Sequence, residues 1–303
     1  MSTRIRHTVA AVAVAAAVTG TTLLGVSVSA NAATSGAHGA LTISNGTKYV
    51  LVNGRRVNFG VPVHDLAWAP NGNKAAFVDG SGNLDVANPD GSGRVVVARN
   101  PGNQNWSHPT WQVRATDTRN GIPGADNLIF AARAKDVSRL EYVSAKAVHG
   151  TPKTLSLNGE PGPGETRLPQ TGNVWPNGGG KYGTSVYANV HTGDVYIRDD
   201  YIRQQGGALT KGSEPALSPS GDEVVFVRSV AGHDHVFVES LTHNSAAKDL
   251  TPHATTDYTE PAWSPNGATL AVRTPNGIVT IPASGKGRPS KVTSAVGLPT
   301  YRP

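Results

Sequence analysis

Residues 260–267 read Glu-Pro-Ala-Trp-Ser-Pro-Asn-Gly, and related octets recur along the chain. Two other full copies run from Asp65 to Gly72 and from Glu214 to Gly221, and shortened relatives begin at His108 and Leu298. Each copy combines a short apolar stretch with a Pro-x-Gly corner, which is typical of a strand followed by a tight turn. The chain is therefore organised as a repeat.

The aromatic or leucine position of each copy gives the spacing of the repeat. These positions are Trp68, Trp111, Leu217, Trp263 and Tyr301, at intervals of 43, 106, 46 and 38 residues. The interval of 106 fits two repeats, with a degenerate copy near Val174-Trp175-Pro176-Asn177-Gly178. A period of about 40–50 residues with several short strands per unit predicts a β-propeller.

The local chemistry of one unit explains this reading. Proline fixes φ at the first corner of the turn, and Asn-Gly or Ser-Gly takes the corner that needs an unusual φ. Three further strands follow, for example at residues 269–272, 278–281 and 291–293. One such sheet cannot bury both of its faces alone, but a ring of sheets can.

The two ends of the chain predict how the ring closes. Leu298 to Pro303 reads as the inner strand of a blade, whereas residues 41–60 supply strands with no inner strand before them. Pairing the two ends in one blade removes the open edges. The sequence therefore predicts an all-β, six-bladed β-propeller of four-stranded antiparallel blades over residues 41–303, preceded by a flexible leader at 33–40.

Residues 1–32 have the composition of a secretory signal peptide. Arg4 and Arg6 precede an Ala/Val-rich run, and small residues offer a cleavage site after Ala30 or Ala32. An uncleaved membrane anchor is the alternative, but polar residues interrupt the apolar run. We expect cleavage and export by the general secretory route, to the periplasm, cell envelope or extracellular space, without a membrane anchor.

Composition excludes several classes of site. The chain has no cysteine, which excludes disulfides, thiolate catalysis, Cys-ligated zinc and iron–sulfur clusters. It has 27 basic and 21 acidic residues, and removal of residues 1–32 with their two arginines leaves a net charge of +4. The basic residues form no run, so we expect no nucleic-acid partner. Hydrolase, metalloprotease, P-loop and dinucleotide motifs are absent from the sequence. We expect a monomer.

The Glu-Pro-Ala-Trp-Ser-Pro-Asn-Gly pattern resembles the WD40-like repeat of TolB-type propellers. The copies from Glu214 and Glu260 match closely and the copy from Asp65 matches well, and the resemblance covers about residues 60–303, with its weakest stretch at 115–210. The resemblance implies a propeller with a scaffold or docking role in the cell envelope. The separate N-terminal α/β domain of that family has no recognisable copy here, which favours a free-standing binding module.

One position carries the candidate binding residues. It lies just before each inner strand and holds Asp65, His108, Glu214 and Glu260. In a propeller these side chains converge near one mouth of the central channel, where they could bind a cation or a basic peptide segment. Alternatively, each side chain caps backbone N–H groups or pairs with the neighbouring blade. We expect no catalytic residue and no resident metal or cofactor, with a channel-bound divalent cation left open.

Two long segments and one histidine pair stand apart from the repeat. The polar insertion at 114–127 and the Gly- and Pro-rich segment at 158–184 are either binding loops or neutral insertions. His233 and His235 alternate by two, as paired metal ligands on one strand face would. No third ligand lies nearby in sequence, so a solvated turn is the favoured interpretation.

These observations favour an exported, non-catalytic propeller that binds a protein or peptide at its channel mouth. The rival is a propeller enzyme, a lyase or hydrolase acting on extracellular carbohydrate or lactone, with the four polar residues as acid, base or metal ligands. An enzyme predicts a tight polar cluster with perturbed ionisation in a concave pocket. A binding module predicts a shallow mouth with the same residues tied to the backbone.

Overall fold

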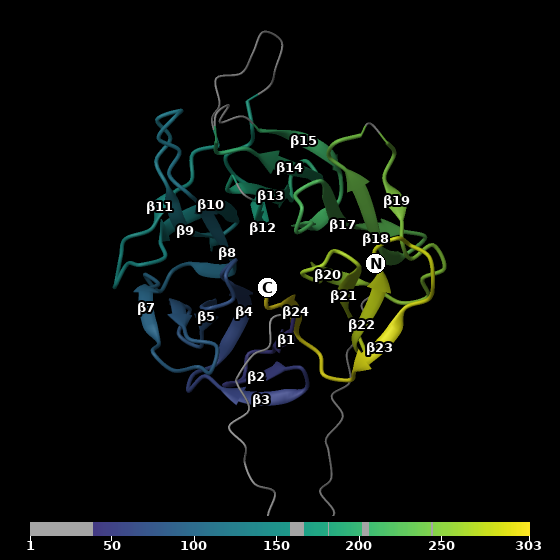
Figure 1. Ribbon diagram of the computed structural model, residues 1–303, viewed down its shortest axis with the longest axis horizontal. Coiled ribbons are helices and arrows are strands. Elements are labelled where there is room, and N and C mark those ends of the chain that lie inside the picture. Colours follow the sequence, from purple (N-terminus) through teal and green to yellow (C-terminus); the bar gives the residue numbers. More distant parts are fainter. Residues whose placement is uncertain (1–38, 158–166, 181, 202–205, 244) are drawn as a thin grey trace, which may run out of the picture. The chain divides into compact units, whose positions relative to one another are not determined.

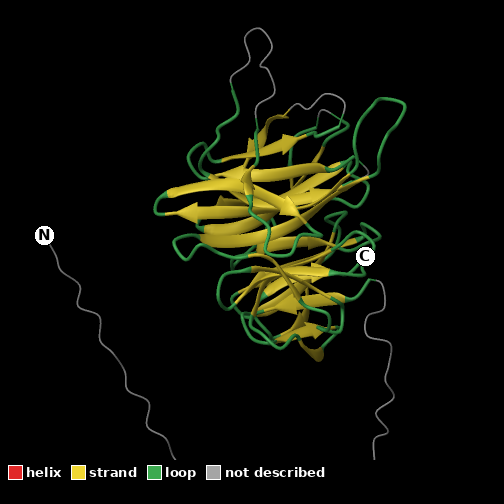
Figure 2. Cartoon of the chain, turned by 90° about the vertical axis from the view of Figure 1, so that its left-hand side faces the viewer, coloured by secondary structure: helices red, strands yellow, loops and turns green. Residues whose placement is uncertain are grey.

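The computed structural model describes residues 39–157, 167–180, 182–201, 206–243 and 245–303. The predicted signal peptide and residues 33–38 of the predicted leader lie outside the described residues. All regular structure in the described part is β-strand (Figure 2). No helix in these ranges has the length and apolar character needed to cross a bilayer.

The described strands form six four-stranded antiparallel sheets around a central axis, which confirms the predicted six-bladed propeller (Figure 1). From the centre outward, blade 1 contains β24 (Leu298–Tyr301), β1 (Leu41–Ser44), β2 (Tyr49–Val52) and β3 (Arg55–Asn58). Blade 2 contains β4 (Val63–Trp68), β5 (Ala75–Asp79), β6 (Leu84–Ala87) and β7 (Val95–Ala98). Blade 3 contains β8 (Asn105–Arg114), β9 (Ala125–Ala134), β10 (Val137–Ser144) and β11 (Lys153–Thr154).

The other three blades follow the same order. Blade 4 contains β12 (Asn173–Gly179), β13 (Thr184–Asn189), β14 (Asp194–Arg198) and β15 (Gly206–Lys211). Blade 5 contains β16 (Ser213–Leu217), β17 (Glu223–Val230), β18 (His233–Ser240) and β19 (Lys248–Asp249). Blade 6 contains β20 (Thr259–Trp263), β21 (Thr269–Thr274), β22 (Gly277–Pro282) and β23 (Ser290–Thr293).

Blade 1 closes the ring as predicted. Strand β24 pairs with β1 in antiparallel register, from Leu41 opposite Tyr301 to Ser44 opposite Leu298. The closure reaches slightly further than expected. The backbone N–H of Arg302 donates to the carbonyl of Ala40, which is buried, so the last residue of the predicted leader belongs to the ring.

The turn after each full repeat has the predicted backbone. Gly72, Gly221 and Gly267 have φ values of 66°, 79° and 70°, a region that glycine enters without steric cost. In the copy from Glu260, the N–H of Gly267 donates to the carbonyl of Ser264 over 2.8 Å. The Pro-Asn-Gly corner therefore reverses the inner strand into the second strand.

Five of the six inner strands share a β-bulge that the sequence did not predict. At the bulge, one non-glycine residue has a φ of 49–52°: Asp65, His108, Trp175, Glu214 and Glu260. This left-handed conformation is uncommon for such residues, and a bulge re-aims the side chain of the extra residue. These positions are the predicted polar residues together with Trp175.

Neighbouring blades are joined by indole hydrogen bonds as well as by apolar packing. Trp111 Nε1 donates to the carbonyl of Ala67 in blade 2, and Trp263 Nε1 donates to the carbonyl of Ala216 in blade 5, each over 3.1 Å. Both indoles are buried between blades. These two tryptophans therefore donate to a carbonyl of the preceding blade while filling the space between sheets, whereas Trp68 Nε1 donates to Thr42 Oγ1 of blade 1 over 3.0 Å.

Blade 4 shows why its copy of the motif is degenerate. Gly178 stands where the other copies carry Trp, Leu or Tyr, and a Cβ at this position would lie 2.4 Å from the carbonyl oxygen of Trp111. The backbone of blade 4 thus approaches blade 3 too closely for any side chain. The N–H of Gly178 instead donates to Thr110 Oγ1 over 2.7 Å.

We expect Trp263→Phe to lower the free energy of unfolding by about 1–3 kcal/mol, because it removes the hydrogen bond that crosses to the carbonyl of Ala216 and leaves a void between the two blades. Trp106→Phe is the matched control. Trp106 is also buried, but its Nε1 donates to Gln104 Oε1 within the same blade, and this side chain can turn to water. Urea unfolding measures both, and equal losses would contradict the role of the bond between blades.

Candidate functional site

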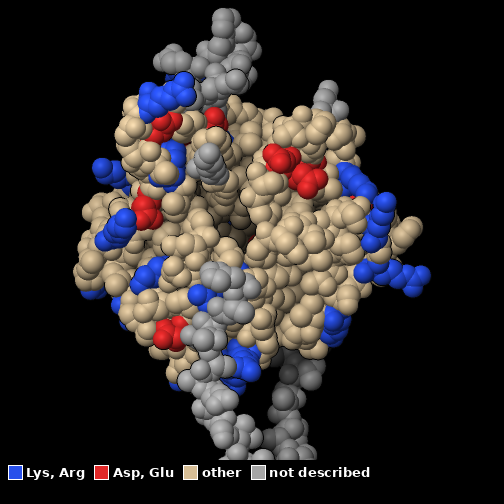
Figure 3. All heavy atoms as spheres, viewed as in Figure 1, with Lys and Arg blue, Asp and Glu red and all other residues tan. Residues whose placement is uncertain are grey.

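A cavity of about 630 Å³, which we call the funnel, occupies the centre of the ring and is lined by the inner strands of all six blades. Figure 3 shows it as a hollow near the centre of one face. On every inner strand the lining begins at the same position and continues towards the end of the strand. Six residues hold this first position and form the floor: Asp65, His108, Trp175, Glu214, Glu260 and Leu298.

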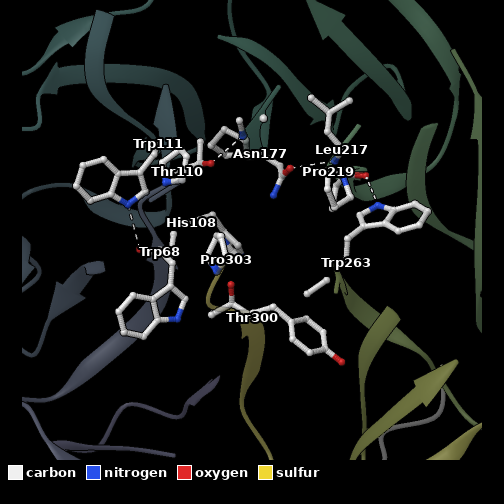
Figure 4. A pocket seen from close by; sticks show the side chains of 18 of the residues that line it. Trp68, His108, Thr110, Trp111, Asn177, Leu217, Pro219, Trp263, Thr300 and Pro303 are labelled. Atoms are coloured by element: carbon white, nitrogen blue, oxygen red, sulfur yellow. Dashed lines mark hydrogen bonds between the residues drawn. The ribbon is translucent and has the colours of Figure 1, made fainter. Parts of the chain in front are cut away.

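The wall of the funnel is mainly aromatic, aliphatic and proline-rich. The side chains of Trp68, Trp111 and Trp263 are arranged around it (Figure 4), and Tyr301 also belongs to the lining. Near the ends of the inner strands the lining contains four prolines: Pro70, Pro219, Pro265 and Pro303. Polar groups are few, and Thr300 points into the cavity from β24 (Figure 4). An apolar concave wall with a few polar groups is typical of a ligand site.

In the floor, two of the predicted carboxylates are tied to the neighbouring blade. Asp65 Oδ2 accepts a hydrogen bond from the backbone N–H of His108 over 3.1 Å. Glu214 Oε2 accepts one from the backbone N–H of Glu260 over 2.5 Å. For Asp65 and Glu214, these bonds are of the kind that the alternative interpretation expects, in which the polar position links one blade to the next.

The other two predicted residues meet across the channel. His108 belongs to blade 3 and Glu260 to blade 6, which lie opposite one another in the ring (Figure 1). Nevertheless, His108 Nε2 lies 3.3 Å from Glu260 Oε1. Asp65 Oδ2 lies 3.8 Å from His108 Nδ1, and Arg273 Nη2 lies 3.9 Å from Glu260 Oε1. The imidazole therefore joins opposite blades through the axis of the ring.

The floor shifts the ionisation of two of its members. Burial by itself lowers the pKa of His108, but the hydrogen bond to Glu260 and the nearby carboxylate charges outweigh it and raise the pKa to about 9. Burial and the charge of Glu260 raise the pKa of Glu214 to about 7. Near neutral pH the floor thus holds an imidazolium among carboxylates, one of which is half protonated.

The floor residues that the structure describes do not come together as a set of metal ligands. Among the described residues, no group of three or more His, Asp or Glu side chains has an arrangement that could hold a metal ion. A metal would also require His108 to lose its proton, which the surrounding carboxylates oppose. A channel-bound divalent cation therefore finds no preformed ligand set in the described residues.

Trp175 is the floor residue that sequence reasoning missed. It takes the polar position in blade 4, and its ring centroid lies 6.3 Å from that of His108 with the planes at 73°. The available signal was the following proline, because His108, Glu214 and Glu260 also precede proline. The repeats were aligned on the aromatic position, where blade 4 carries Gly178. This alignment therefore did not reveal that Trp175 takes the polar position in blade 4.

The predicted insertion at 114–127 continues the hairpin of β8 and β9 beyond the repeat. Its beginning reaches the cavity, because Ala115 belongs to the lining, as does Val113 just before the insertion. The turn is fastened to blade 4, where Asp117 accepts a hydrogen bond from the hydroxyl of Tyr201. The insertion therefore raises the rim of the funnel between blades 3 and 4. In the second predicted segment, residues 158–166 and 181 lie outside the described residues.

His233 and His235 are not arranged as metal ligands in the structure. His233 is partly exposed beside the turn, and its Nδ1 lies 3.3 Å from Asp257 Oδ1. His235 is buried within β18, and its Nδ1 lies 2.8 Å from Asp249 Oδ2. The solvated-turn interpretation was therefore wrong for His235, because strand β18 already begins at His233 and carries the second ring into the blade.

Comparison with known proteins shows the fold. No family model and no curated protein matches the sequence. TolB from Acinetobacter baumannii is similar in structure with a TM-score of 0.61 at 16% identity, covering 87% of this chain and 66% of that chain. A putative TolB from Agrobacterium tumefaciens gives 0.58 at 15% identity, covering 85% and 89%.

A chain of the nidogen/laminin complex is also similar, with a TM-score of 0.54 at 11% identity, covering 87% of this chain and 98% of that chain. The present chain thus spans just under two thirds of the Acinetobacter protein. The predicted resemblance to TolB-type propellers is confirmed for the fold.

We expect stability to fall as pH rises through the folded-state pKa of His108. The pKa in the fold, about 9, exceeds the ordinary value of 6.5. The imidazolium therefore stabilises the fold fully below pH 6.5, and this stabilisation is lost by about pH 9. Relative to His108→Gln, the native protein should lose up to roughly 3 kcal/mol more over this window in urea unfolding.

Glu214→Gln distinguishes the contribution of Glu214 to the pH dependence of stability from that of His108. The raised pKa of Glu214, about 7 against an ordinary 4.5, makes stability fall as pH rises through the lower window. Glu214→Gln should remove the fall in stability between about pH 4.5 and pH 7 and keep the fall between about pH 6.5 and pH 9. An unchanged pH profile in His108→Gln would show that the cross-channel pair does not stabilise the fold.

Proposed function

We propose that this protein is an exported, non-catalytic scaffold that binds a peptide segment of a protein partner in its central funnel. The main support for this proposal is the central funnel. It has room for several side chains, an apolar wall and a floor that is already satisfied by bonds between blades. A segment entering from the open end would bury apolar side chains against the tryptophans and prolines of the wall.

The floor would select the tip of the bound segment. When Glu214 is ionised, the carboxylates of Asp65, Glu214 and Glu260 exceed the His108 imidazolium and the Arg273 guanidinium by one negative charge, and a basic group nearby would favour this ionised form. A basic side chain or an amino group at the tip would be favoured there, as expected for a basic peptide segment. The nidogen/laminin structure, a propeller fold in a protein–protein complex, agrees with this use of the architecture.

Export and the monomeric state remain part of the proposal. The signal-peptide composition of residues 1–32 supports export to the cell envelope or extracellular space. The closed ring supports a monomer, because blade 1 is completed by the two ends of one chain and not by a strand of a second copy.

A propeller enzyme acting on carbohydrate or lactone is the second candidate, and one observation favours it. Glu214 has a pKa near 7 and lines a concave cavity, which is the setting of a general acid–base group. Against this, Glu214 Oε2 is held by the N–H of Glu260. Glu214→Gln preserves that acceptor and removes the proton, so loss of a turnover found with glycan or lactone panels would establish the enzyme.

We expect Thr300→Trp to abolish peptide binding, because the indole would fill the funnel that Thr300 faces. The probe is a displayed library of random peptides, selected on the immobilised native protein and then measured as free peptides. Ser290→Trp is the matched control, since Ser290 is exposed on the outer strand β23. A loss of at least about tenfold in affinity is expected for Thr300→Trp and none for Ser290→Trp.

Two results would contradict the proposal. One is a selection that yields no consensus peptide. The other is a consensus peptide that binds both tryptophan variants as well as the native protein, which would place the site outside the funnel. A thermal shift with Ca²⁺ or Zn²⁺ that a chelator removes would instead assign the floor to a cation.

A further inference from the structure

The acidic and basic residues are distributed unevenly around the ring. Residues 261–303 and 39–64 contain eight Lys or Arg and no Asp or Glu. Residues 65–260 contain 17 Lys or Arg and 21 Asp or Glu. Because β24 pairs with β1, the two acid-free ranges are joined, and together they form blade 1 and nearly all of blade 6. We call this region the basic sector.

Most of the basic side chains in the sector reach the surface. Six of them are exposed, on the outer strands and on turns: Lys48, Arg55, Arg56, Lys286, Arg288 and Lys291. Figure 3 shows blue side chains along the lower right edge of this face and no red ones there. Lys248 of blade 5 extends the group, since its Nζ donates to the carbonyl of Ser284 in blade 6.

These side chains differ from the basic residues elsewhere in the ring. In the other blades many are neutralised, as in Arg94 with Asp85 at 2.6 Å and Lys211 with Asp194 at 2.8 Å. No carboxylate of the described residues forms an ion pair with any of the six exposed side chains of the sector. Arg56 instead lies over the ring of Tyr49, 4.1 Å from its centroid. The positive potential of the sector is therefore not cancelled locally.

The sector lies away from the funnel. Strands β3 and β23 are the outermost strands of blades 1 and 6, and neither lines the central cavity. The six side chains thus form a band over the outer strands and turns of blades 6 and 1, and none of them lines the central cavity. A ligand for such a band must carry many negative charges along its length.

We propose that the basic sector binds a linear anionic polysaccharide along the edge of blades 6 and 1, independently of the central funnel. The outer strands of the two blades face outward in different directions (Figure 1), so a flexible chain can follow both while a flat bilayer cannot. No aromatic side chain of the sector is exposed, so the stacking platforms that single-stranded nucleic acids need are missing from it.

The test compares two variants with the same net charge. The sector variant combines Arg55→Gln, Lys286→Gln, Arg288→Gln and Lys291→Gln. The control variant combines Arg119→Gln, Arg139→Gln, Lys146→Gln and Lys153→Gln, which are exposed basic residues of blade 3. Binding of the full chain to heparin and to polygalacturonate is measured by calorimetry at about 0.15 M salt. The same proteins are tested against duplex DNA and against phosphatidylglycerol vesicles.

The native protein and the control variant should bind both polysaccharides alike, and the sector variant should bind at least about tenfold more weakly. The slope of log K against log salt should fall in magnitude by up to about 3 for the four lost contacts. Equal losses of affinity in the two variants would mean that net charge alone explains the binding, and this would overturn the proposal. Absence of polysaccharide binding, or tighter binding to DNA or vesicles, would overturn it as well. Thr300→Trp should bind the polysaccharides normally, which separates this surface from the funnel.

Discussion

The pairing of residues 298–301 with residues 41–44 is the constraint on which both candidate surfaces depend. It fixes the ring at six blades, so that blades 3 and 6 lie opposite each other and His108 meets Glu260 across the axis. It also brings the two acid-free ends of the sequence side by side. Without closure, the inner edge of β1 would be unpaired and neither the funnel floor nor the basic sector would be assembled.

The bulge in five inner strands converts a repeat into a site. A left-handed residue at the same place in five of the inner strands turns its side chain towards the axis, and Leu298 of β24 completes the set of six floor residues. Such backbone conformations persist only where the surroundings hold them. Here the holding groups are the neighbouring blades, through the Asp65–His108 and Glu214–Glu260 bonds. The floor is thus both the joint between blades and the end of the cavity.

Much of the site could be predicted from particular residues, and the misses have physical causes. Asp65, His108, Glu214 and Glu260 were found because they share one place in the repeat, and they do converge. Trp175 was missed because Gly178, forced by the carbonyl of Trp111, breaks the aromatic column used for alignment. The basic sector was missed because the bases are scattered in the sequence and form no run. They form one surface only because ring closure places blades 6 and 1 next to each other.

By itself, the sequence determined the all-β class, the repeat, the number of blades, the closing strand pair and the residues that approach the axis. These follow from local chemistry, because turn residues and a period-two apolar pattern act over a few neighbours and repeat in each unit. Only the tertiary structure decided which partner each polar side chain takes, how the ionisation of His108 and Glu214 shifts, and where like charges gather. Those properties depend on distances between residues far apart in the sequence, such as His108 and Glu260, which are 152 positions apart, and such distances are set only when the ring closes.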